Sequence, residues 1–302
     1  MSSVRLGPVS LVKLLARRRR VAARNAWSRL TLDAHQRHEL DELRNFAYTR
    51  SRFYGRFHDG KEHAQLPDLP VLTKTTLMEH WDGVVTDPSI SLDRVLRFVE
   101  GLGAPALLDD RYFVTTTSGT TGLKGAFVYG RDEWISVLAS YARANDWAGV
   151  PASLTHRLRL AVVSTTVPWH QSAVVGASLK GPLVPTLRLD ATSPMEEIVS
   201  ALNDFQPESL VAYAGMAKAL ALEQLDGRLH VDPRSVMCAS EVPPLDGGHS
   251  QSRLTFAGLC PGDLGELSAE DSAVLHSLMD IESSAELPSL CRQQRGLTDV
   301  DE

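Results

Sequence analysis

Apolar and polar positions follow a regular rhythm between residues 158 and 240. Short runs rich in β-branched residues alternate with segments whose apolar residues recur at helical spacing. This alternation predicts an α/β fold in which a mostly parallel sheet carries helices on its faces. Ligands on such sheets bind at the carboxyl ends of the strands. The expected strands are residues 158–167, 183–191, 208–215 and 233–240, and the expected helices are residues 170–181, 193–206 and 216–227.

Residues at the ends of these helices support the assigned boundaries. Gly181 and Gly227 are placed where glycine commonly ends a helix. Ser193 is expected to be an N-cap, with Pro194 at the first helical position and Glu196 completing a capping box.

The chain before residue 158 predicts mainly helices. Residues 31–57 form an expected amphipathic helix, and residues 132–150 form another after a glycine-rich loop. Between them, two prolines interrupt an extended run, and Thr73 is a candidate N-cap for a short helix. The expected apolar faces are Leu32, Leu40, Leu43, Phe46 and Ala47 in the first helix and Trp134, Val137, Leu138, Tyr141 and Ala142 in the second.

The rhythm stops beyond Glu241. Residues 243–302 are rich in proline, glycine, serine and acids, and only residues 269–279 indicate a short helix. We therefore expect three parts: a basic N-terminal extension or helix over residues 1–30, a partial nucleotide-binding domain over residues 31–242, and an acidic tail of low regularity over residues 243–302.

Composition places the 302-residue chain among ordinary globular proteins, with 43% hydrophobic and 23% charged residues. No run of 18 apolar residues predicts an integral membrane segment. The N-terminus lacks the order of charge and apolar residues found in secretory signals, so a cytoplasmic location is expected. Cys238, Cys260 and Cys291 lack the paired spacing of a zinc site, so no metal site is expected from them.

The net charge of −6 is unevenly distributed. Residues 1–30 contain eight basic residues and no acid, whereas residues 261–302 contain ten acids against two arginines. A basic start can bind nucleic acid or an anionic membrane surface. A solvated helix face or a frayed terminus is the favoured interpretation, and we expect no nucleic-acid partner because no aromatic residue interrupts the arginine cluster as base stacking would require.

The stretch Val114–Phe127, VTTTSGTTGLKGAF, is dense in hydroxyls and glycine. A phosphate group needs converging N–H and O–H donors on a backbone that can approach closely, and small residues allow this approach. The pattern is neither the P-loop GxxxxGK[ST] nor the dinucleotide fingerprint GxGxxG. A tight structural turn is the alternative, but so many hydroxyls and glycines in succession favour a phosphate site.

This loop resembles the phosphate-binding motif SGTTGxPKG of the adenylate-forming superfamily, which includes the acyl-CoA synthetases. The match holds from Ser118 to Gly122 and then departs, because Lys124 stands at the usual proline position and Gly125 at the usual lysine position. The departure is similar to the phenylacetate-CoA ligase branch. Segments LPVLTKTTLMEHW and VPWHQSA are similar to segments of that branch, and the resemblance covers about residues 40 to 242.

The resemblance implies an ATP-dependent acid–CoA ligase, which joins a small-molecule carboxylate to AMP and then transfers the acyl group to CoA, with Mg²⁺ bound to the ATP. Trp169 and His170 would line the carboxylate pocket and Glu241 would lie near the adenine. Each also has a purely structural interpretation. Trp169 could be a core or pocket-wall aromatic, His170 a histidine with its hydrogen bonds satisfied, and Glu241 a solvated carboxylate. Lys74 is expected to be a surface lysine. The implied phosphate-binding residues are Thr117, Ser118, Gly119, Thr120, Thr121, Gly122 and Lys124.

Other parts of the family's machinery have no counterpart after Glu241. The aromatic-Gly-x-Thr-Glu segment that helps hold magnesium is missing, and residues 243–302 contain no lysine to match the family's C-terminal catalytic lysine. We therefore expect the C-terminal lid domain to be absent and catalysis to be impaired. A truncated or frameshifted product is favoured over a natural short homologue. The alternative function is a non-catalytic nucleotide-binding or partner-binding module, and the sequence leaves the oligomeric state open.

Overall fold

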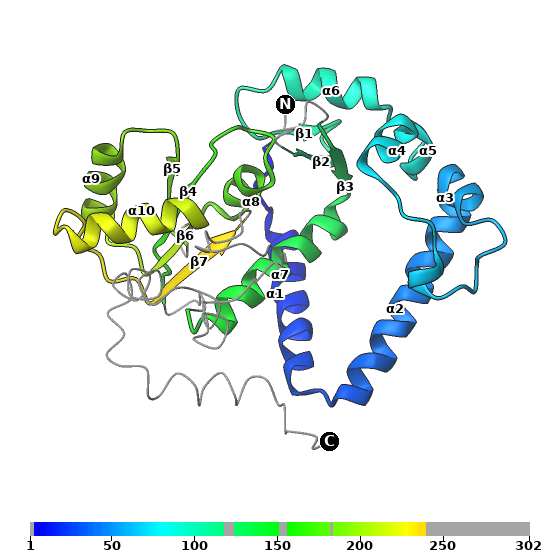
Figure 1. Ribbon diagram of the computed structural model, residues 1–302, viewed down its shortest axis with the longest axis horizontal. Helices are drawn as coiled ribbons and strands as arrows, with labels where there is room; N and C mark the ends of the chain where they lie inside the picture. Colours follow the sequence, from blue (N-terminus) through cyan, green and yellow to red (C-terminus); the bar gives the residue numbers. More distant parts are fainter. Residues whose placement is uncertain (1–2, 118–123, 151–155, 182–183, 240–302) are drawn as a thin grey trace, which may run out of the picture. The chain divides into compact units, whose positions relative to one another are not determined.

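The computed structural model describes residues 3–117, 124–150, 156–181 and 184–239. The chain divides into two compact units, and each is described by itself. Unit 1 comprises Met1–Ser140 and Val167–Ser178, and unit 2 comprises Tyr141–Thr166 and Leu179–Glu302. Figure 1 labels the helices and strands of both units.

Unit 2 contains the parallel sheet that the sequence predicts. Four strands lie in the order β5-β4-β6-β7, and every neighbouring pair is parallel. Helices α9 and α10 bury apolar side chains against this sheet, among them Ile198, Leu202 and Leu220. The α/β expectation is therefore confirmed. The elements are β4 (Leu160–Ser164), β5 (Thr186–Asp190), α9 (Met195–Phe205), β6 (Ser209–Tyr213), α10 (Ala214–Leu225) and β7 (Ser235–Ala239).

Polar groups join the carboxyl ends of three of these strands. The Asp190 carboxylate, at the end of β5, accepts hydrogen bonds from the amide and hydroxyl of Thr166. The Tyr213 hydroxyl, at the end of β6, accepts a hydrogen bond of 3.1 Å from the Thr165 amide. The Arg188 guanidinium donates to the Thr165 carbonyl at 3.0 Å. The segment that follows β4 is therefore hydrogen-bonded to side chains of β5 and β6 at the carboxyl ends of these strands.

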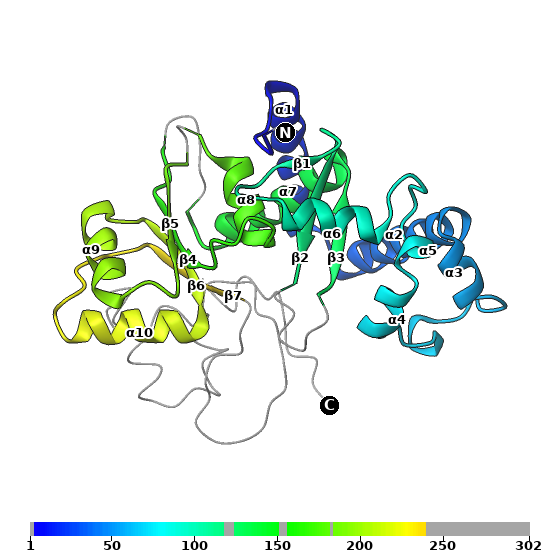
Figure 2. The same cartoon turned by 90° about the horizontal axis from the view of Figure 1, so that it is seen from above.

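Unit 1 combines helices with a small antiparallel sheet, ordered β1-β2-β3. Strand β2 pairs with β3 from Phe113 opposite Tyr129 to Thr116 opposite Ala126. Figure 2 shows the same elements from above. The elements are α1 (Pro8–Ala23), η1 (Arg24–Ala26), α2 (Arg29–Arg50), α3 (Arg52–Phe57), η2 (Leu66–Asp68), α4 (Lys74–Glu79), α5 (Trp81–Val84), α6 (Leu92–Glu100), β1 (Leu107–Leu108), β2 (Tyr112–Thr116), β3 (Ala126–Tyr129), α7 (Arg131–Trp147), which continues into unit 2, and α8 (Gln171–Leu179).

Two buried tryptophans hold the sheet of unit 1 in place. The Trp81 indole donates a hydrogen bond of 2.9 Å to the Ala126 carbonyl on β3. The Trp134 indole donates to the Ser178 hydroxyl at 2.9 Å and stacks on the Phe113 ring, with centroids 4.9 Å apart. Because both indole N–H groups have partners, these large aromatic side chains are buried without an unsatisfied donor.

Three sequence-based details differ from the structure. The expected helix over residues 31–57 is interrupted at Ser51, whose hydroxyl accepts a hydrogen bond from the Tyr54 amide and so starts α3. Helix α2 buries none of its side chains; Leu43 and Phe46 are exposed. Helix α9 begins at Met195 with Pro194 as N-cap, so the capping box expected from Ser193 and Glu196 is wrong.

The buried face of α7 is also rotated slightly from the expected one. Trp134 and Leu138 are buried as expected, but Ile135 and Ala139 complete the face in place of Val137. Thr73 caps α4 as expected, since its hydroxyl accepts a hydrogen bond from the Thr76 amide. Among the helices of the described ranges, none is long and apolar enough to cross a membrane.

Candidate functional site

The hydroxyl-rich loop, residues 117–125, connects the two strands of an antiparallel hairpin. The sequence predicted a helix after this loop, but strand β3 follows it first and α7 begins only at Arg131. At the base of the loop the Thr117 amide donates to the Gly125 carbonyl, and the Gly125 amide donates to the Thr117 hydroxyl, both at 2.9 Å. The ends of the loop are therefore fixed to each other.

The side chain of Lys74 lies at the base of this loop. A Cβ atom built on Gly125 would be 3.5 Å from the Lys74 Cε atom and 3.3 Å from the Phe127 ring. Position 125 therefore has little room for a side chain. Lys74 is the first residue of α4 and is half-buried, whereas the sequence interpretation placed it on the surface.

Trp169 and His170 also lie beside the loop. The Trp169 carbonyl accepts a hydrogen bond of 2.9 Å from the amide of Thr116, the last residue of β2. Trp169 packs against the apolar core that contains Trp81 and Ala126. His170 stands directly before α8, and its carbonyl accepts the Ala173 amide at 2.9 Å. The segment that resembles the family's substrate side is thus hydrogen-bonded to the strand that leads into the loop.

His170 has a shifted acid–base equilibrium. Burial lowers the pKa of its imidazole, and the positive charge of Lys124 lowers this pKa further. His170 is therefore neutral at pH 7, and a nearby anion would raise its pKa again. The protonation of His170, beside Lys124 at the base of the loop, would therefore change when an anion binds there.

The Thr116 hydroxyl is buried without a hydrogen-bond partner among the described residues. A buried hydroxyl without a partner costs about 1–3 kcal/mol of folding free energy. Thr116 directly precedes the loop. Hydroxyls and cations are the groups that bind phosphate oxygens. The chemistry of the described residues therefore fits a phosphate group.

The structure brings four of the predicted site residues to one end of unit 1: Thr117, Lys124, Trp169 and His170. Their roles stay predictions. Sequence reasoning did not name Thr116, for which the run of three threonines was the available signal, and it expected Lys74 to be a surface lysine. The predicted site residues Ser118, Gly119, Thr120, Thr121, Gly122 and Glu241 lie outside the described residues.

Metal ligands are sparse in the part of the chain that the structure describes. No group of three or more histidine, cysteine, aspartate or glutamate side chains is arranged to hold a metal ion there. The described residues at the loop therefore supply no Mg²⁺ carboxylate cluster of their own.

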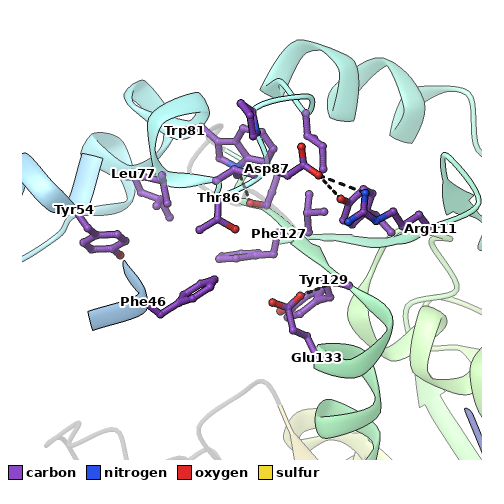
Figure 3. Close-up of a pocket in the computed structure, with 18 of the residues that line it drawn as sticks. Phe46, Tyr54, Leu77, Trp81, Thr86, Asp87, Arg111, Phe127, Tyr129 and Glu133 are labelled. Atoms are coloured by element: carbon purple, nitrogen blue, oxygen red, sulfur yellow. Dashed lines mark hydrogen bonds and ion pairs between the residues drawn. The ribbon is translucent and has the colours of Figure 1, made fainter. Parts of the chain in front are cut away.

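A pocket of about 1040 Å³ adjoins the loop within unit 1. Figure 3 shows the rings of Phe46 and Phe127 pointing into it, from α2 and β3. Trp81 and Tyr129 form further parts of its wall. Phe127 connects the pocket to the loop, because its ring is also a near neighbour of Gly125. None of these lining residues was predicted as a site residue.

Asp87 is the polar centre of one side of this pocket. Hydrogen bonds from Ser89 and Tyr112 lower the pKa of the Asp87 carboxyl to about 2, and the Arg111 guanidinium at 3.6 Å contributes. Burial and the neighbouring Asp87 raise the pKa of the Tyr112 hydroxyl. The carboxylate is therefore ionised at neutral pH and already hydrogen-bonded, as the dashed lines in Figure 3 indicate.

Comparison with known proteins finds remote structural similarity. No protein-family model matches the chain, and no curated protein sequence matches it. Similar solved structures include 2-hydroxyisobutyryl-CoA ligase with 2-HIB-AMP and CoA in the thioesterification state, with 19% identity, a TM-score of 0.49, and coverage of 68% of this chain and 42% of that one. The open conformation of that ligase has 19% identity, a TM-score of 0.45, and coverage of 63% and 39%.

A third similar structure is the complex of VinN with L-aspartate. It has 14% identity, a TM-score of 0.35, and coverage of 70% of this chain and 43% of that one. The chain thus spans less than half the length of these solved proteins.

Proposed function

We propose that this chain carries the phosphate-binding part of an ATP-dependent acid–CoA ligase. The observation that carries the proposal is the grouping at the base of the hydroxyl-rich loop: a buried Thr116 hydroxyl without a partner in the described ranges, together with Lys74, Lys124 and His170. Hydroxyl donors and positive charges on a fixed loop base stabilise phosphate oxygens. The order of motifs in the sequence, which resembles the phenylacetate-CoA ligase branch, supports the same function.

Lys74 compensates in this proposal for the lysine that the loop lacks. Gly125 stands where the family's loop lysine usually is, and the aliphatic stem of Lys74 passes within van der Waals reach of that position. A lysine supplied from α4 places its charge near the same phosphate oxygens. Lys124 adds a second charge from the loop's end.

In the reaction that this proposal assigns, a carboxylate oxygen attacks the α-phosphorus of ATP, and pyrophosphate leaves. The residues of the loop and both lysines would stabilise the negative charge that develops on the leaving pyrophosphate. Neutral His170 would bind the incoming carboxylate or a phosphate oxygen by a hydrogen bond. Mg²⁺ and CoA belong to the proposal through the family resemblance.

Nucleotide binding is tested with MgATP and the purified full chain by isothermal titration calorimetry. Lys74→Ala is expected to weaken MgATP binding by about 10-fold, since a hydrogen bond to a charged group contributes about 1.5–3 kcal/mol. Lys180→Ala is the matched control, because Lys180 is an exposed lysine of unit 2. Absence of MgATP binding at millimolar concentration, or equal affinity of Lys74→Ala and the parent chain, would contradict the proposal.

Catalysis is tested separately by carboxylate-dependent ATP–pyrophosphate exchange across a panel of carboxylic acids. Exchange that requires both a carboxylate and Lys74 supports the ligase function. MgATP binding without exchange supports the nucleotide-binding module instead. The two measurements thus separate the phosphate site from the activity assigned to it.

A further inference from the structure

Helix α1 exposes aliphatic side chains beside a cluster of cations. Val9 and Val12 are 73% and 68% exposed, and Leu11 and Leu15 are also exposed. The helix continues through Arg17–Arg20, and no acid occurs before Asp33. We call the exposed Val9, Leu11, Val12 and Leu15 the apolar face of α1. Covering these four aliphatic side chains would remove apolar surface from water, which favours binding of a partner to this face.

The opposite side of α1 is fixed to unit 1. Leu14 is buried, and Lys13 forms an ion pair of 2.7 Å with Asp132 at the start of α7. The Leu6 amide donates to the Ser178 carbonyl at 3.4 Å, just before the helix begins. At 100° per residue, the Val12 side chain lies about 160° around the helix from that of Leu14. Val12 therefore points away from the packed side of the helix, and Val9, Leu11 and Leu15 are exposed as well.

Exposed large apolar residues are concentrated here. Of the 14 in the described part of the chain, six lie between residues 9 and 30. Single exposed apolar residues are ordinary, but a cluster rimmed by charges marks an interaction surface. Besides the apolar face of α1, these six include Trp27, whose ring lies 5.6 Å from the Arg24 guanidinium, and Leu30, which follow α1 at the turn into α2.

We propose that α1 and the following turn bind peripherally to an anionic membrane surface. Apolar side chains that enter the headgroup region, with arginines that reach anionic lipid headgroups, are the combination found in interfacial helices. Each Lys or Arg near such a surface adds electrostatic attraction to the anionic headgroups. The helix lies in the plane of the interface and does not span it. This site is independent of the phosphate site at the hydroxyl-rich loop.

Charge decides between the possible occupants of this face. A second copy of the chain docked through α1 would bring two strongly basic helices together, which like-charge repulsion opposes. Nucleic acid would satisfy the arginines, but its phosphate backbone offers no partner for Val9, Val12 and Leu15. An anionic bilayer satisfies both the cations and the aliphatic side chains.

Vesicle co-sedimentation tests the proposal with the full chain. We expect binding to vesicles of equal parts phosphatidylglycerol and phosphatidylcholine at low salt, and little binding to phosphatidylcholine alone. Arg19→Gln with Arg20→Gln should weaken partitioning roughly 30-fold, since about 1 kcal/mol is lost per charge. Leu11→Gln with Val12→Gln and Leu15→Gln should weaken it on the order of 100-fold while every cation is kept.

The matched control is Leu222→Gln with Leu225→Gln, which changes exposed leucines on α10 and should leave partitioning unchanged. All these positions are exposed, so the variants should fold, and circular dichroism checks this. No binding to the anionic vesicles, or equal binding of the Leu11, Val12 and Leu15 variant, overturns the proposal. Binding of duplex DNA without vesicle binding, measured by fluorescence anisotropy, also overturns it and assigns the arginines to nucleic acid.

Discussion

Thr116 and His170 are the two residues whose substitution tests the candidate phosphate site most directly. Both lie at the base of the hydroxyl-rich loop, and each is in a state that an anion would change. The Thr116 hydroxyl is without a partner in the described ranges, and burial with Lys124 nearby holds the His170 pKa low.

Thr116→Val separates the binding role of the hydroxyl from its structural cost. Valine keeps the shape of threonine and removes a buried hydroxyl without a described partner, so stability should be unchanged or higher by about 1 kcal/mol. MgATP affinity should fall about 10-fold if that hydroxyl donates to a phosphate. Thr115→Val is the control, because alternate residues of a strand point to opposite faces. Urea unfolding and calorimetry give both quantities; unchanged MgATP affinity would leave Thr116 without a binding role.

His170 predicts how anion binding should depend on pH. Its pKa in the free protein is below its ordinary value, and a bound polyphosphate would raise it. Protonation therefore favours binding: affinity should increase as pH falls through the raised pKa and level off below the free-protein pKa. His170→Gln should remove this contribution. Titration of MgATP binding between pH 5 and 8 measures it, and an identical pH profile in the variant would rule the histidine out.

At the scale of elements, Ser51 decides how the N-terminal helices fold. Its hydroxyl caps α3 through the Tyr54 amide and donates to the Gly83 carbonyl at 2.9 Å, which joins α3 to the end of α5. The buried Ser51 side chain thus separates α2 from α3 and also joins the start of α3 to α5.

Ser51→Ala is expected to destabilise unit 1 by about 1–3 kcal/mol, because it removes a cap and leaves a carbonyl without its donor. Thr73→Ala removes only a local cap on α4 and should cost about 1 kcal/mol. Chemical denaturation compares the two. Equal costs would show that the hydrogen bond to Gly83 contributes nothing.

At the scale of the whole molecule, the N-terminal segment is part of the packing of unit 1. Val4 is 2% exposed, and Ser3 pairs with Ala106 in an isolated antiparallel bridge. The basic helix α1 is therefore attached through residues on both sides of it, which is why point substitutions serve better than deletion for testing its surface.

Val4→Ala should lower the free energy of unfolding by about 2 kcal/mol, from lost apolar burial and the cavity left behind. Val71→Ala is the matched control, since Val71 is exposed and should show almost no change. Thermal denaturation of the two variants provides the comparison. A stability loss in neither variant would mean that the N-terminal segment does not contribute to the core.

The sequence predicted the parallel sheet of unit 2 well, because its strands and helices are set by local periodicity. Strands β4 to β7 and helices α8 to α10 all fall within their expected ranges to within a few residues. It did not predict the antiparallel sheet of unit 1. Strand β3 has four residues, too few for alternation to stand out beside a glycine-rich loop.

For the candidate site, too, some features could be predicted from the sequence and others required the tertiary structure. The sequence by itself determined the α/β class and the hydroxyl-rich loop, since both depend on residues close together in the chain. Only the tertiary structure placed Lys74 against Gly125, which follows it 51 residues later in the chain, and fixed the outward direction of Val12 on α1. Periodicity identifies which side chains share a face, but packing between distant segments decides which of those faces is covered and which cations meet.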